Sequence, residues 1–179
     1  MELIVDENIV LKSVEEKDAA SLFHIVMKNL ERFKPWFGWV HQIDSVQPIE
    51  NFVKACINNE DKVGYASMVI FYNNQPVGFI GHQNYKSFNK SLQLGYWLDQ
   101  AHEGKGVMTK SVIKMIDYAF ELGMNKVEIY CASDNVRSRK IPERLGFTEE
   151  GTIRAAELIN DVYLDDVVYG VLKDEWIKD

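Results

Sequence analysis

The chain has 179 residues, 46% of them apolar, so it can bury one sizeable core and is too short for two ordinary domains. A formal net charge of -7 at pH 7 disfavours direct binding to nucleic acid, because no net positive field attracts phosphates. The chain has only two cysteines, no basic leader followed by an apolar run, and no apolar stretch long enough to cross a membrane. We therefore expect a single domain over residues 1–179, in the cytoplasm, without a membrane span.

The first third of the chain is predicted to form one strand and two helices. Residues 3–14 alternate apolar and polar side chains, which is typical of a strand. Apolar residues recur at spacings of three and four over 18–30, which predicts an amphipathic helix. Pro48 in a first turn opens a second helix over 48–58. Between the helices, residues 31–40 carry four aromatic side chains around a proline and favour an ordered loop.

The middle of the chain predicts an antiparallel meander, with strands at 65–72, 77–82 and 92–98. The remaining pattern predicts, in order, a helix over 106–122, a strand over 126–132, a helix over 135–145, and strands over 149–155 and 162–172. Only one strand-helix-strand crossover is available. The fold class is therefore a mixed α/β sheet rather than a doubly wound one.

A short glycine-rich segment, Glu103-Gly104-Lys105-Gly106, lies between the strand ending at Leu98 and the next helix. A helix start presents free backbone N–H groups and the positive end of the peptide dipoles, so such a loop is suited to phosphate oxygens. Lys105 adds charge and Thr109 adds a hydroxyl donor. The alternative is a tight turn that needs two glycines for its backbone angles and binds nothing. The spacing matches neither a dinucleotide-binding fingerprint nor a Walker loop.

Four segments follow one another in order: Gly95-Tyr96-Trp97-Leu98, Glu103 to Thr109, Asp134-Asn135-Val136-Arg137-Ser138, and Arg144-Leu145-Gly146-Phe147. Together they resemble the GNAT superfamily of acetyl-CoA-dependent N-acetyltransferases, and specifically the subgroup that acetylates the N-termini of ribosomal proteins. The family signature Gln/Arg-x-x-Gly-x-Gly/Ala falls on Glu103, Gly106 and Met108, and its first and last positions depart from the pattern. The resemblance implies the GNAT fold: a central, mostly antiparallel sheet with one splayed parallel strand pair and helices on both faces.

The same resemblance implies acetyl-CoA as cofactor, no metal, and a possible homodimer. Backbone groups near the splayed strand end would bond the pantetheine arm and polarise the thioester carbonyl. Asn135 would bond the same arm, although it is equally a good helix cap, and the basic residues Arg139, Lys140 and Arg144 would meet the outer phosphate unless they are merely solvated. The expected cofactor-binding residues are Trp97, Leu98, Gly104, Lys105, Gly106, Val107, Met108, Thr109, Asn135, Ser138 and Arg139.

Two side chains are the expected catalytic groups. Many family members protonate the departing thiolate with a tyrosine that is replaced here by Pro142, so Ser138 is the nearest hydroxyl for that role. Glu157, in the expected loop between the last two strands, resembles the glutamate assigned as base in the ribosomal-protein subgroup. Asp161, Asp165 and Asp166 are its rivals, and each of these groups also has a reading as a solvated side chain.

The acceptor is expected to be an amine, with a protein N-terminus first. Trp36 and Trp39 would line its pocket together with Glu157, unless the aromatic segment is only a cover for the core. A negative surface equally suits a polyamine or an aminoglycoside. A protein that binds CoA without turnover, as a sensor, is the alternative from another class, and a protein with purely structural glycines is the third.

Overall fold

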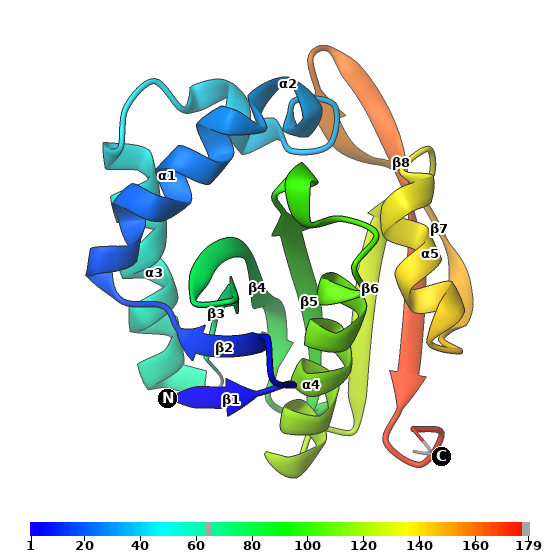
Figure 1. Cartoon of the computed structure of the whole chain (residues 1–179). Helices are drawn as coiled ribbons and strands as arrows, with labels where there is room; N and C mark the ends of the chain where they lie inside the picture. Colours follow the sequence, from blue (N-terminus) through cyan, green and yellow to red (C-terminus); the bar gives the residue numbers. More distant parts are fainter. Residues whose placement is uncertain (64–65, 177–179) are drawn as a thin grey trace.

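The computed structural model describes residues 1–63 and 66–176, and these form one eight-stranded sheet in the order β1-β2-β3-β4-β5-β6-β8-β7 (Figure 1). Only β5 and β6 are parallel neighbours, and every other pair is antiparallel. This confirms the expected mixed sheet. The strands are β1 Glu2–Ile4, β2 Ile9–Ser13, β3 Met68–Tyr72, β4 Gln75–Lys86, β5 Ser91–Leu98, β6 Lys126–Ala132, β7 Thr148–Ile159 and β8 Val162–Leu172.

Helices cover both faces of the sheet. The α-helices are α1 Ala19–Lys28, α2 Leu30–Phe33, α3 Gln47–Val63, α4 Val107–Glu121 and α5 Val136–Arg144, and three short 3-10 helices are η1 Glu16–Asp18, η2 Gly38–Gln42 and η3 Gln100–His102. One buried apolar cluster joins α4 to the sheet, with α5 against its edge. A second cluster joins α1 and α3 to the opposite face. Figure 1 shows these helices apart on the two sides. No helix within the described ranges is long and apolar enough to cross a membrane.

The two parallel strands separate after four residue pairs. Residues 91–94 of β5 pair with residues 126–129 of β6, and beyond that point β6 continues beside β8 while β5 continues beside β4. One edge of residues 95–98 is therefore left without a strand partner. This opening lies directly before the glycine-rich segment and is the splayed pair that the resemblance implied.

The register of β4 and β5 decides which main-chain groups face the opening. The Asp99 amide donates to the Val77 carbonyl at 2.8 Å. Because hydrogen-bonded and non-hydrogen-bonded pairs alternate along an antiparallel ladder, Trp97 also directs its main-chain groups toward β4. Leu98 directs its own toward the opening, where its carbonyl accepts from Arg32 at 3.1 Å.

Some elements differ from the sequence expectation. Residues 3–14 form a hairpin of β1 and β2 rather than one strand, because the Asp6 side chain accepts from the amides of Asn8 and Ile9, both at 2.9 Å, and closes a turn. The second helix starts one residue earlier than predicted and extends to Val63. Tyr65, where a strand was expected to begin, lies outside the described residues.

Candidate functional site

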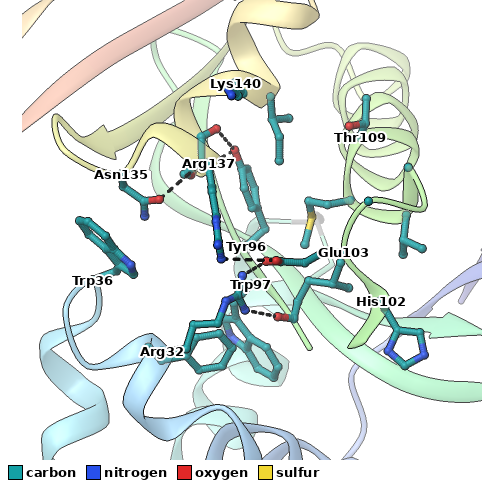
Figure 2. A pocket seen from close by; sticks show the side chains of 18 of the residues that line it. Arg32, Trp36, Tyr96, Trp97, His102, Glu103, Thr109, Asn135, Arg137 and Lys140 are labelled. Atoms are coloured by element: carbon teal, nitrogen blue, oxygen red, sulfur yellow. Dashed lines mark hydrogen bonds and ion pairs between the residues drawn. The ribbon is translucent and has the colours of Figure 1, made fainter. Parts of the chain in front are cut away.

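A cavity of about 550 Å³ lies at the splayed end of β5 and β6. Its walls come from the end of β5, the loop after it, the first turn of α4, one side of α5 along its length, and the segment that contains α2 (Figure 2). These segments are far apart in the sequence. The fold therefore brings the glycine-rich loop, Asn135, Ser138 and part of the aromatic segment to one place.

Gly104 and Gly106 of the glycine-rich loop line this cavity. Gly104 and Gly106 have φ of 72° and 75°, the left-handed region that a residue with a side chain adopts only at a cost. Gly106 is the N-cap residue of α4. Within the described part of the chain, the amides of residues 104–109 form no hydrogen bond inside the protein. Free amides at the positive end of a helix dipole are suited to an anion such as a diphosphate.

Of the other loop residues predicted to bind the cofactor, three line the cavity and one does not. Val107 and Met108 line the cavity and are buried, and Thr109 also lines it. The guanidinium of Arg144 donates to the Thr109 hydroxyl at 3.1 Å, which ties the start of α4 to α5. The Lys105 ammonium lies 5.5 Å from the centre of the Tyr72 ring and does not line the cavity.

A cluster of hydroxyls occupies the α5 side of the cavity. The Asn135 side chain caps α5 by accepting from the Ser138 amide at 3.2 Å, as its capping role predicted, and it also lines the cavity. The Ser138 hydroxyl donates to the Tyr96 hydroxyl at 3.5 Å, and Tyr96 donates to the Ser138 carbonyl at 3.3 Å. The Cys131 thiol donates to the Ser138 hydroxyl at 3.2 Å. Ser138 is thus the centre of a small polar network.

Burial controls the protonation of the partners of Ser138. It raises the pKa of Tyr96, so the phenol stays protonated at neutral pH and acts as a neutral donor. Burial also raises the pKa of the Cys131 thiol to about 11, so the thiol is not a nucleophile at neutral pH. Tyr96 belongs to a segment that resembles the family, but it was not among the expected site residues, and the structure places it on the cavity wall.

The structure does not bring Arg139 to the cavity. Its guanidinium donates to the Tyr169 hydroxyl at 2.9 Å and to the Ser133 carbonyl at 3.0 Å. Lys140 and Arg144, which the sequence placed near the outer phosphate, do line the cavity. The difference arises because adjacent helix positions lie about 100° apart, so neighbouring basic residues face different surroundings.

The aromatic segment contributes part of the cavity wall. Trp36 lines it together with Phe33 and Phe37. Trp39 does not; it lies on the surface, with its ring 5.7 Å from that of Phe37. Its assignment to the acceptor pocket therefore has no support from the cavity itself.

Glu157 lies in β7 rather than in a loop, which corrects the sequence expectation. The strand continues past an irregularity between Ile153 and Glu157, so that Glu157 pairs with Leu164. The Ala155 amide is held there by the Asp165 carboxylate at 2.8 Å. The sequence pattern predicts that the strand ends at Ala155. In the structure, where Asp165 of the neighbouring strand binds the Ala155 amide, the strand extends to Ile159.

Two carboxylates beside this irregularity have altered acidity. Burial raises the pKa of Glu157, and the nearby charge of Asp166 raises it further, although the residue as a whole is exposed. Burial and the charge of Asp165 raise the pKa of Asp166, which pairs with Ala132 at the end of β6. A raised pKa makes either group a better proton acceptor at neutral pH. Neither lines the cavity.

Three charged residues line the cavity, Arg32, Glu103 and Arg137, and none was among the site residues expected from the sequence. Figure 2 shows both guanidiniums directed at the Glu103 carboxylate. Glu103 and Arg137 belong to the segments that resemble the family, whereas Arg32 lies in the aromatic segment with Glu31 and Lys34 and carries no distinguishing signal. Among residues 1–63 and 66–176, no three His, Cys, Asp or Glu side chains are grouped so that they could hold a metal ion.

Free amides at the start of α4 suit a diphosphate, and the unpaired edge of β5 suits an extended arm that carries amides. Together they define the class of acyltransferases that use a CoA thioester. Residues 8–148 match the family model described as the acetyltransferase (GNAT) domain. The chain belongs to this family, and it is an acyltransferase of the N-acetyltransferase class.

The chain is also similar over nearly its whole length to three proteins that are named as acetyltransferases. The chain is 33% identical over 174 residues to "Putative ribosomal N-acetyltransferase YdaF" of Bacillus subtilis (strain 168), covering 96% of this chain and 95% of that one. It is 28% identical over 172 residues to the ribosomal-protein-serine acetyltransferase of Escherichia coli (strain K12), covering 95% and 96%. The solved structure of RimL, a ribosomal L7/L12 alpha-N-protein acetyltransferase in complex with coenzyme A, has a TM-score of 0.93 at 26% identity and covers 98% of this chain and 99% of that one.

Proposed function

We propose that this chain transfers the acetyl group of acetyl-CoA to the N-terminal α-amine of a protein, with a ribosomal protein as the acceptor. The observation that carries the proposal is the set of free amides over residues 104–109, at the opening between β5 and β6. The names of two relatives, and of the structural neighbour that binds CoA, support the acceptor class.

The cavity residues divide into groups that hold the cofactor and groups that handle protons. Residues 104–109 would hold the diphosphate, and the Leu98 main chain and Asn135 would meet the arm. The cofactor supplies the activated acetyl thioester. Ser138, held by Tyr96, is the hydroxyl proposed to stabilise the departing sulfur.

The incoming amine must be neutral before it attacks. A main-chain α-amine has a pKa about 2.5 units below that of lysine, so neutralising it costs about 3.5 kcal/mol less. A carboxylate of raised pKa is a sufficient base for this, and we assign the role to Glu157, with Asp166 beside it. The two carboxylates also suit the positive charge of the amine before it loses its proton.

The experiment is an acetylation assay with labelled acetyl-CoA and four acceptors. They are a peptide with a free N-terminus taken from a ribosomal protein, the same peptide with a blocked N-terminus and an internal lysine, spermidine, and an aminoglycoside. Transfer to the free N-terminal peptide, lost in Glu157→Gln, supports the proposal. Transfer only to spermidine or to the aminoglycoside would replace the acceptor. Tight CoA binding without transfer to any amine would indicate a sensor.

The proposal also covers the domain organisation, the cellular compartment and the oligomeric state. We propose that the chain acts as one domain in the cytoplasm and pairs with a second copy. One continuous sheet supports the single domain, and the free cysteines Cys56 and Cys131 are compatible with a reducing compartment. Exposed apolar side chains at the β7–β8 hairpin, Leu158, Val162 and Tyr163, support self-association. Light scattering measures the mass in solution, and a monomer over the whole concentration range would exclude the pair.

A further inference from the structure

Three charged side chains from distant segments form a row across the cavity (Figure 2). Arg32 comes from α2, Glu103 from the loop before α4, and Arg137 from the first turn of α5. Arg32 forms an ion pair with one carboxylate oxygen of Glu103. Arg137 lies 3.5 Å from the other oxygen.

The two arginines are held unequally. The Arg32 guanidinium also donates to the Leu98 carbonyl at 3.1 Å, and its side chain is 23% exposed. Arg137 has the single long contact with Glu103, and its side chain is 72% exposed. A half-buried, twice-bonded guanidinium stays in place, whereas an exposed one with a single weak contact exchanges readily. Arg137 is therefore the movable member of the row.

The position of Glu103 makes this exchange consequential. Glu103 directly precedes the amides of residues 104–109, so its negative charge stands beside the proposed diphosphate site. A carboxylate there repels phosphates unless cations balance it. Burial and the charge of Arg137 lower the pKa of Arg32, whereas the charge of Asp99 raises it. The two guanidiniums repel each other, and the Glu103 carboxylate lies between them and pairs with both.

We propose that Glu103 is a positioning residue that sets the affinity for the phosphates of CoA. It holds Arg32 at the Leu98 carbonyl, and it yields Arg137 to the diphosphate when the cofactor binds. This inference rests on the proposed function, because it presumes that CoA occupies the cavity. It assigns roles to three charged side chains, in addition to the main-chain amides of the glycine-rich segment and the hydroxyls around Ser138.

The test measures dissociation constants by calorimetry for two probes, CoA and pantetheine, which has the same arm and no phosphates. The variants are Glu103→Gln and Arg137→Gln. Glu150→Gln is the matched control, because Glu150 also pairs with a cation, Lys126, and is 35% exposed against 32% for Glu103, but it does not line the cavity.

For CoA, we expect Glu103→Gln to bind about twofold to fivefold more tightly and Arg137→Gln about twofold to fivefold more weakly, the range of a partly exposed ion pair. Pantetheine affinity should be unchanged in both variants, and Glu150→Gln should change neither probe. The dependence of CoA affinity on salt should also be weaker in Arg137→Gln than in the wild type.

Several results would overturn the inference. Unchanged CoA affinity in both variants would do so, and so would equal shifts for CoA and pantetheine, which indicate a general change of the cavity. If Glu103→Gln fails to fold because Arg32 loses its counter-charge, Arg137→Gln decides alone, since Arg137 is exposed. A wild-type protein that does not bind CoA contradicts the proposed function itself, which separates the two failures.

Discussion

Tyr96 and Ser138 bond to each other twice across the open end of the splayed strands. Tyr96 donates to the Ser138 carbonyl at 3.3 Å, and the Ser138 hydroxyl donates to the Tyr96 hydroxyl at 3.5 Å. The pair joins the end of β5 to the first turn of α5, so the orientation of Ser138 depends on a residue 42 positions away in the sequence. Any role of the Ser138 hydroxyl therefore depends on Tyr96 as well.

Removing either hydroxyl should show this dependence. We expect Ser138→Ala to lower kcat by about 100-fold, at the low end of acid-base contributions, and Tyr96→Phe to lower it by less. The double variant should match Ser138→Ala alone, because residues that act as one unit are not additive. Steady-state kinetics of the three variants check this. Losses that multiply would show that the two hydroxyls act independently.

The left-handed glycines give a test that separates binding from stability. Gly106→Ala and Gly123→Ala both place a side chain at positive φ, 75° and 87°, and each should destabilise the fold by about 1–2 kcal/mol. Only Gly106→Ala should weaken CoA binding, by about tenfold or more, because it redirects amides that meet charged phosphates. Thermal unfolding and calorimetry measure the two effects. Equal loss of affinity in both variants would contradict a local role for Gly106.

Substitution of two basic residues of α5 should affect different properties: stability for Arg139 and CoA affinity for Arg144. Arg139→Gln removes one of the two partners of the Tyr169 hydroxyl, the other being Glu143, and should lower the free energy of unfolding by about 1 kcal/mol, with CoA affinity unchanged. Arg144→Gln removes a cavity-lining cation and should weaken CoA binding with little change in stability. A weaker CoA complex in Arg139→Gln would restore the sequence expectation that this residue holds the cofactor.

The raised pKa values of Glu157 and Asp166 predict that the activity depends on pH. The base must be deprotonated, so kcat/KM should fall as the pH drops through the pKa of Glu157, at a higher pH than for an ordinary glutamate near 4.3. Asp166→Asn removes a neighbouring charge and should move this limb to lower pH. Glu157→Gln should abolish it. An unshifted limb in Asp166→Asn would mean that Asp166 does not influence the base.

The same shift has a consequence for stability. Because the folded-state pKa of Asp166 is raised, the folded protein binds this proton more tightly than the unfolded chain does. The carboxylate therefore destabilises the fold as the pH rises from the unfolded pKa, near 3.9, through the folded one. Asp166→Asn should be more stable than the wild type at neutral pH, and the difference should vanish below about pH 4. Thermal unfolding at several pH values measures it.

Patterns within one element were predicted well from the sequence. The strand over 126–132 coincides with β6, and the helix expected over 106–122 is α4 to within one residue at each end. The helix is bounded by Gly106 and Gly123, and the strand is a short, largely apolar run. The β1–β2 hairpin was missed because the turn depends on one side chain, Asp6, rather than on a glycine or a proline.

Contacts between elements were not predictable in this way. The row of Arg32, Glu103 and Arg137 joins three segments whose spacing carries no periodic signal. Glu157 was expected in a loop because alternation stops near Ala155, which has φ of 51° and depends on Asp165 of the next strand. Ser138 was named from a sequence resemblance, but its bonds to Tyr96 and Cys131 join elements whose contacts the sequence pattern does not encode.

The whole proposed function depends on the amides of residues 104–109, which are expected to bind the phosphates of CoA. An amide NMR titration of the labelled protein with CoA tests it directly. We expect the largest saturable shifts at these six amides, and much smaller ones with pantetheine. Saturable binding whose shifts lie elsewhere, with the signals of Gly104 and Gly106 unmoved, would contradict the account.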